Sequence, residues 1–499
     1  MAITGIGGAS AQSLQSIIDM RSQLDDLQRQ LGSGQKATSY AGLGLDRNLA
    51  IGLRSQLSAI SGYQQSITQV GVRLDLMQTA LTQFDSISQK TKSAIVQSQF
   101  ALKGTTQTDD QRNTKGVLDQ AIGMLNSGGA DGRYLFSGRN VTQVPVETSD
   151  HILNGNGLQA GLKQIIDERR QADLGTSGLG RLTVGNTGTG VSLTEDAGVF
   201  GFKLASASTN VSGATVTGPS APPAVLSVDF GATNPTAGNT VTFTFTLPDG
   251  TTRDLKLTAT TSSTPAAGEF TIGANSTATA ANLETALTQS LGTLAQTELV
   301  AASAVAAGDN FFNTDAGNPP QRVDGPPFDT ATGLIDGTAA NTVQWYLGDN
   351  GTDDPRTTAV ARADTSLTVA YGARANEQAL RASIQSMALF TAVNFDPTDP
   401  NGQGQYSALK ARLNTALVGS ANTQKVSDLA GELAGAQTSL NNAKDRHDQA
   451  NTTLQNLLQS VAGTTPEQVG TQILALQTSL QATLQTTALL LKTSLINYL

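Results

Sequence analysis

Two long segments of this 499-residue chain place an apolar residue at nearly every third or fourth position. That spacing follows one face of an α-helix, and when it persists over many turns it predicts a stripe that packs against another helix, as in a coiled coil. We call these stripes the seams. A helix from Leu53 to Leu102 would be about 75 Å long, which suits a rod better than a compact domain. The N-terminal seam comprises Ile60, Tyr63, Ile67, Val70, Leu74, Met77, Leu81 and Phe84, and the C-terminal seam comprises Val426, Leu429, Leu433, Ala436, Leu440, Ala443, His447, Ala450, Leu454, Leu457 and Val461.

Both ends of the chain carry further helices with the same spacing. Gly32 interrupts the first of them, and Pro466 opens the last, which stays apolar as far as Leu499. An apolar stripe that reaches the end of a chain needs a partner, so we favour a rod that packs against other copies over the core of an ordinary helical bundle. The predicted packing and assembly residues are Ile17, Leu24, Leu31, Ile67, Leu74, Leu81, Leu433, Leu440, Leu480, Leu495 and Leu499.

Between the helical ends, residues 175–341 show short strands and turns. Apolar residues alternate with threonines from Val241 to Leu247, and Pro248 to Gly250 turns the chain, which predicts a hairpin with one buried face. A single amphipathic helix is expected near residues 279–294. The predicted fold class is therefore α+β, with a long antiparallel helical coiled-coil rod of paired N- and C-terminal segments and a β-rich insertion.

Three domains follow from these changes of pattern. Residues 1–45 and 462–499 would form paired terminal helices, and residues 46–174 and 342–461 would form the helical rod. Residues 175–341 would be an insertion that faces outward.

The residues that usually carry chemistry are scarce. The chain has no cysteine and two histidines, His151 and His447, so thiolate sites are excluded and we expect no metal and no cofactor. His447 lies on a seam and is predicted to be a structural polar residue. The acidic run from Asp349 to Asp354 lacks the spacing of a calcium loop and is predicted to be a turn. A carboxylate pair assembled by the fold stays possible, but no motif marks one, so we expect no enzyme.

Charge and hydropathy limit the partners and the location. The net charge is −9, and without a basic run neither nucleic acid nor a membrane is expected as a partner. No apolar stretch approaches the roughly 18 residues of a membrane span. Residues 1–8 lack the pattern of a cleaved signal peptide, so the chain would stay in the cytosol or leave by a route that reads no such signal.

One segment near the N-terminus resembles the bacterial flagellin family. The run from Leu27 to Lys36, followed by Ala41 to Asp46 and a long helix, is similar to the segment after the first helix of flagellins. This chain has Gly44 to Asn48 where that family usually carries an acidic run.

Other segments resemble the flagellin-like subunits at the junction of hook and filament. Asp131 to Gly138 is similar to their signature, as are Trp345 to Asp349 and Ser494 to Leu499. The motif residues are Gly132, Arg133, Tyr134, Phe136 and Gly138.

This resemblance implies a structural subunit of the bacterial flagellum, and of motility, that assembles itself through its terminal helices and is exported without a cleaved signal peptide. It implies an extracellular location at the hook–filament junction. The implied partners are copies of the chain, the junction protein on the hook side, flagellin and an export chaperone. Two alternatives stay open: the filament flagellin itself, and a secreted adhesin or surface enzyme whose activity lies in residues 175–341.

Overall fold

The computed structural model describes residues 4–129, 131–220, 222–418 and 423–496. Helix accounts for 53% of the chain and strand for 15%, which confirms the expected α+β class. The described residues form two compact units. The first unit draws on residues 1–71, 361–369 and 437–499, and the second on residues 72–360 and 370–436. The units divide the chain at other points than the three predicted domains, which stay a prediction.

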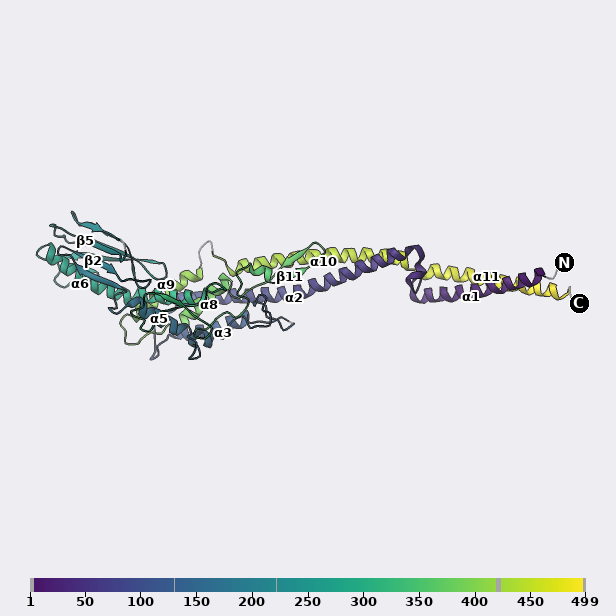
Figure 1. The fold of residues 1–499 in the computed structure, drawn as a ribbon, viewed down its shortest axis with the longest axis horizontal. Helices are drawn as coiled ribbons and strands as arrows, with labels where there is room; N and C mark the ends of the chain where they lie inside the picture. The colour runs from purple at the N-terminus through teal and green to yellow at the C-terminus, as the bar shows by residue number, and fades with distance from the viewer. Residues whose placement is uncertain (1–3, 130, 221, 419–422, 497–499) are drawn as a thin grey trace. The chain divides into compact units, whose positions relative to one another are not determined.

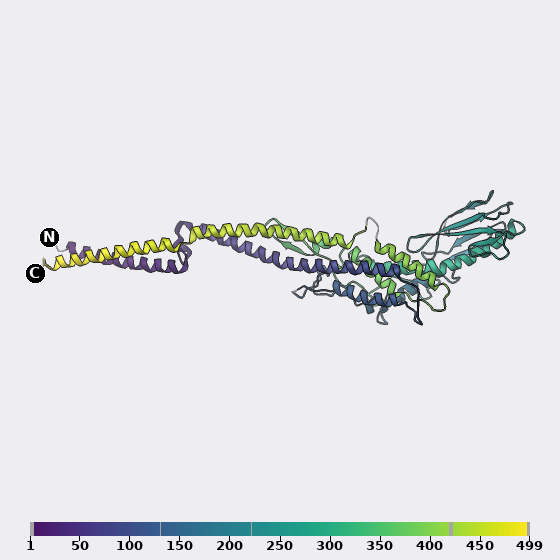
Figure 2. The ribbon, with the colours of Figure 1, turned by 180° about the vertical axis from the view of Figure 1, so that it is seen from behind.

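The first unit is built from antiparallel helices. Helix α1 (Thr4–Ser33) lies beside α11 (Pro466–Ile496), and the first described turn of α1 and the last of α11 are at the same end of the pair (Figures 1 and 2). The short helix η1 (Tyr40–Asp46) leads into α2 (Arg47–Gln97), and α10 (Val426–Ala462) leads into α11. At 51 residues, α2 is about 76 Å long.

Two side-chain contacts join α2 to α10 within the first unit. Gln64 Nε2 donates to Asp448 Oδ1 at 2.6 Å, and the Tyr63 ring stacks on His447 with centroids 5.5 Å apart. The segment 361–369, from the hairpin of β11 (Val360–Arg362) and β12 (Thr368–Ala370), also belongs here. His447 Nε2 lies 2.7 Å from the carbonyl oxygen of Ala363 in that segment, so the ring is paired although it is buried.

The helical part of the second unit surrounds its own core. Helix α3 (Asp109–Leu125) packs on α8 (Gln378–Ala392), and α5 (Leu162–Leu174) packs on α7 (Val300–Phe312). Helix α9 (Gly402–Val418) contacts both α7 and α8, and α4 (Ser149–Asn154) lies against α5. The start of α3 is set by a capping box, in which Thr108 Oγ1 accepts from Gln111 N while Gln111 Oε1 accepts from Thr108 N.

Two four-stranded sheets and one helix complete the second unit. Strands β1, β2, β5 and β4 form one sheet in that order, and β3, β6, β7 and β8 form the other, in which only β7 and β8 are parallel. Helix α6 (Ser276–Leu294) packs on strands of both sheets. The strand bounds are β1 Leu182–Asn186, β2 Gly190–Glu195, β3 Lys203–Thr209, β4 Thr215–Thr217, β5 Val225–Asp229, β6 Thr240–Thr246, β7 Thr252–Thr260 and β8 Glu269–Thr271, with a separate pair of β9 Gln321–Val323 and β10 Leu334–Asp336.

The predicted hairpin is confirmed by β6 and β7, which pair around Pro248 to Gly250. Its buried face carries Val241, Phe243 and Phe245, whereas the intervening threonines are half-exposed. Alternation with a period of two placed this face correctly because side chains on a strand point to opposite sides in turn.

The expectation of a single helix in residues 175–341 is wrong. After α6, a short π-helical segment, η2 (Ala295–Leu299), leads into a second helix, α7. Nine of the 13 residues of α7 are buried, and its residues from Val300 to Ala307 are apolar except for Ser303, so the start of this helix carries no polar face that would mark it in the sequence. Since α7 packs on α5 and α9, this part of the chain is joined to helices outside residues 175–341.

Candidate assembly surfaces and the 131–138 loop

The pair formed by α1 and α11 covers little of its own apolar surface. Among the hydrophobic side chains that the structure describes in these two helices, only Val469 is buried. Ile17, Leu24 and Leu480 are half-buried, and Leu31 is 44% exposed. The side chain of Leu495 and the whole of Leu499 lie outside the described residues. Other apolar side chains point outward: Leu14, Ile18, Leu474, Leu484 and Leu489 are 44% to 66% exposed.

A polar joint connects this pair to the rest of the first unit. Lys36 N donates to the carbonyl of Ala462 at 2.9 Å, and Thr464 N donates to that of Gly34 at 3.0 Å. Lys36 Nζ donates to the carbonyls of Ser460 and Val461 at 2.9 and 3.0 Å, where α10 ends. A cation at a helix C-terminus pairs with carbonyls that lack partners within the helix.

The predicted seam positions on α2 and α10 behave differently from those of the terminal pair. In the first unit, Ile67 is 2% exposed and Leu440 is fully buried. In the second unit, Leu74, Leu81 and Leu433 are at most 1% exposed. These five positions are therefore satisfied within one chain, whereas the terminal pair leaves apolar surface for a neighbour.

The loop at residues 131–138 runs from the surface into the core of the second unit. Gly132 and Arg133 are exposed, Tyr134 is half-buried, and Phe136 is fully buried. Arg73 Nη2 of α2 donates to the Tyr134 carbonyl at 2.6 Å, which fixes the middle of the loop.

The end of this loop is bonded to residues 373–375 and to Asp349, the last residue of the 345–349 segment that resembles junction subunits. Ala375 N donates to the Phe136 carbonyl at 2.8 Å, Gly138 N to that of Ala373 at 3.1 Å, and Asp349 N to that of Ser137 at 2.9 Å. Gly138 has a φ of +61°, and a Cβ there would lie 2.6 Å from the Cβ of Asp349. Only glycine fits this close approach.

Two arginines form a network of ion pairs beside the end of the 131–138 loop. Arg374 is 2% exposed, and its guanidinium pairs with Asp353 at 2.6 Å and with Asp349 at 3.1 Å. Arg374 Nη1 also donates to the carbonyls of Gly351 and Asp353. Arg139 reaches the same two carboxylates from the surface side. The run from Asp349 to Asp354 is thus folded around a buried cation.

The electrostatics follow from this geometry. Hydrogen bonds from Arg139 and Arg374 hold the pKa of Asp353 well below its usual value. Burial would raise the pKa of Asp349, but the N–H groups of Gly351 and Arg139 and the charge of Arg374 lower it overall. Both carboxylates are therefore ionised and saturated by donors, which suits a structural role and leaves them no capacity as general bases.

Sequence reasoning missed Arg374 and Arg139. The acidic run was visible, but one arginine lies more than 200 positions from it and the other 20, and no local pattern marks either as its partner.

Among the described residues, there is no group of three or more histidine, aspartate or glutamate side chains that could hold a metal ion. No helix in the described ranges combines the length and the apolar character needed to cross a bilayer.

The chain shows a distant similarity to a known protein. No family model matches the chain. Over 171 residues the chain is 23% identical to Flagellar hook-associated protein 3 of Salmonella typhimurium. The aligned segment covers 34% of this chain and 52% of that protein. The match thus spans about half the length of the curated relative.

Proposed function

We propose that the protein is a structural subunit of the bacterial flagellum that assembles through its terminal helices. The observation that carries this proposal is the α1/α11 pair, in which Val469 is the single buried hydrophobic residue among the described side chains. A helix pair with that much uncovered apolar surface is stable only with neighbours. The distant similarity to a flagellar hook-associated protein supports a place among axial proteins.

Within the flagellum, the proposed position is the junction between hook and filament. The support is the 131–138 loop, whose residues resemble junction subunits and whose end is bonded to Asp349 of the 345–349 segment, which has the same resemblance. In this proposal α2 and α10 form a coiled-coil rod, and copies of the chain pack side by side around an axis. Its neighbours are the hook-side junction protein and flagellin.

The remaining parts of the proposal concern export and chemistry. The chain leaves the cell through the flagellar export route without a cleaved signal peptide, with the help of a chaperone, and acts outside the cell. It has no catalytic role and no cofactor. The saturated carboxylates around Arg374 are consistent with such a structural role.

Gene deletion and labelling test the position. Cells that lack the protein are expected to build hooks, to retain no filament and to release flagellin into the medium. Antibody against residues 182–294 is expected to mark a narrow band at the hook tip. Label along the whole filament would instead identify a filament subunit, and normal filaments without label would refute an axial role.

A further inference from the structure

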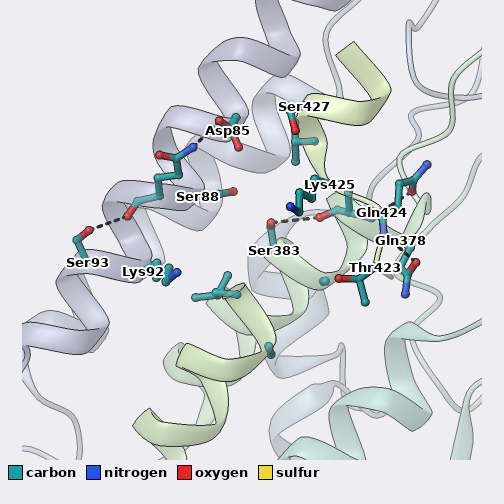
Figure 3. A pocket seen from close by; sticks show the side chains of 16 residues that line it. Asp85, Ser88, Lys92, Ser93, Gln378, Ser383, Thr423, Gln424, Lys425 and Ser427 are labelled. Carbon is teal, nitrogen blue, oxygen red and sulfur yellow. Dashed lines mark hydrogen bonds between the residues drawn. The ribbon is translucent and has the colours of Figure 1, made fainter. Parts of the chain in front are cut away.

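A polar pocket in the second unit lies where α2, α8 and the N-terminus of α10 meet (Figure 3). Its cavity volume is about 480 Å³. The pocket is remote in sequence from the 131–138 loop, and the proposed function makes no use of it. Its lining combines apolar side chains with hydroxyl, amide, ammonium and carboxylate groups, including those of Ser88, Lys92, Gln378, Ser383, Lys425 and Asp85.

The N-terminus of α10 lacks a side-chain cap. Lys425 precedes the first helical residue, Val426, and an ammonium group cannot accept a hydrogen bond. Asp428 lies in the first turn, and its Oδ2 accepts from the N–H of Lys425 at 2.9 Å. Among the described residues, no acceptor pairs with the N–H groups of Val426 and Ser427. These are the groups that a cap would normally satisfy.

Ser88 on α2 provides a second, independent observation. It is 7% exposed, and its Oγ has no hydrogen-bond partner. Figure 3 shows its hydroxyl directed into the pocket. Other hydroxyls on α2 donate to the carbonyl four residues earlier, namely those of Thr68, Thr79, Thr82, Thr91 and Ser93. The Ser88 hydroxyl does not, so it is available to a ligand.

The charges at the pocket favour an anion. Lys92 and Lys425 both line it, and neither forms an ion pair with a described residue. The dipole of the 37-residue helix α10 adds partial positive charge at the same point. Asp85 also lines the pocket and keeps its negative charge while it accepts from Gln89 Nε2 at 2.6 Å, so two ammonium groups face one carboxylate in the lining.

We propose that this pocket binds a small oxyanion of the size of phosphate, which caps α10. Its oxygens accept hydrogen bonds from the N–H groups of Val426 and Ser427 and from Ser88 Oγ, while Lys92 and Lys425 supply the countercharge. The bound anion thereby joins α2 to the start of α10.

Calorimetric titration of the full-length monomer with inorganic phosphate, at constant ionic strength, tests the proposal. The wild-type chain is expected to bind in a saturable manner at one site. Lys92→Met and Ser88→Ala should weaken that binding, by about tenfold for the lysine. Lys90→Met is the matched control, because Lys90 is exposed on the same helix and does not line the pocket.

A second variant separates capping from general screening of charge. Lys425→Ser places a hydroxyl acceptor at the cap position, so amide exchange at residues 426–428 should slow without phosphate, and added phosphate should slow it little further. In the wild-type chain, phosphate should slow the same amides severalfold. The proposal is overturned if phosphate does not saturate, or if Lys90→Met loses as much affinity as Lys92→Met.

Discussion

Single residues show why the same helical spacing has different consequences along the chain. Leu74 and Leu81 are buried within the second unit, whereas Leu31, which was predicted to pack in the same way, is 44% exposed. Their sequence environments are alike, and what differs is the number of helices packed around them. An apolar residue at a seam position therefore contributes to the stability of the monomer only where further elements cover it.

Replacing Leu74 with aspartate should unfold much of the second unit. The change buries an unpaired carboxylate at a position with no exposed surface, at a cost of more than about 3 kcal/mol. Chemical denaturation followed by circular dichroism measures the effect. Gln83→Asp on the exposed side of α2 is the control and should be nearly neutral. Gln78→Asp would be a less suitable control, because Gln78 is half-buried and its Nε2 has no hydrogen-bond acceptor. Equal losses would mean that the seam is not a packing surface.

Replacing Gly138 with alanine should destabilise the second unit by about 2 kcal/mol or more, through both backbone strain and the clash with Asp349. Gly132→Ala shares the positive φ, but its Cβ would meet nothing within 4 Å. That control should cost about 1 kcal/mol from the backbone alone. Similar losses in thermal unfolding for the two variants would contradict the proposed close approach.

The Arg374 network predicts a dependence on pH. The pKa values of Asp349 and Asp353 are lower in the folded chain than the reference value of 3.8. Their stabilisation is therefore present above about pH 4 and is lost as the pH falls below 3.8 toward the folded values. Denaturation at pH 5 and pH 3 should show a smaller pH effect in Asp353→Asn than in the wild type. An unchanged pH effect would argue against the network.

At the scale of elements, the sheets and the helices of the second unit are joined through α7 and through one arginine. Arg412 of α9 is 6% exposed and pairs with Asp249 in the β6–β7 turn and with Glu298 of η2, both at 2.7 Å. The β-rich part is thus anchored by a buried ionic contact as well as by apolar packing.

Two deletions test how much of residues 175–341 the rest of the second unit needs in order to fold. Removing residues 182–294 with a short linker should leave a folded protein, because a Cβ at Gly180 would lie 2.8 Å from Leu299 and the cut ends are therefore close. In this variant Arg412 would keep its ion pair with Glu298. Removing residues 175–341 also deletes α7 and should expose the faces of α5 and α9 that pack on it. Thermal unfolding should be cooperative only for the shorter deletion. The same cooperative unfolding after both deletions would contradict a structural role of α7.

For the whole molecule, the contrast between covered and uncovered apolar surface predicts how the monomer and the assembled form differ. In the proposed assembly, the described residues of α1 and α11 gain contacts from other chains, while the cores around α6 and α8 are complete in one chain. Folding of the ends and assembly are then coupled.

Limited proteolysis of the dilute monomer should remove α1 and α11 first. Cleavage is expected near the joint, around residues 34–46 and 463–465, and should leave the second unit intact as judged by mass spectrometry. Assembled protein should resist the same treatment, because neighbours cover the helix pair. Equal resistance of the ends in the dilute monomer would show that the α1/α11 pair is stable alone.

The sequence by itself determined the features that depend on local periodicity. Apolar residues spaced by three and four predicted α2 and α10, and apolar residues spaced by two predicted β6 and β7. Each period is the one at which side chains return to the same face of a helix or a strand. Helix α7 was not predicted because its residues from Val300 to Ala307 are apolar except for Ser303, which leaves no polar face at its start.

Only the tertiary structure decided which distant groups meet. It brought Arg374 to Asp349 and Asp353, placed Ser88 and Val426 in the lining of one pocket, and left Val469 as the single buried hydrophobic residue among the described side chains of α1 and α11. The physical reason is common to these cases. A buried charge or an exposed leucine is defined by what surrounds it in space, and residues far apart in the chain supply those surroundings.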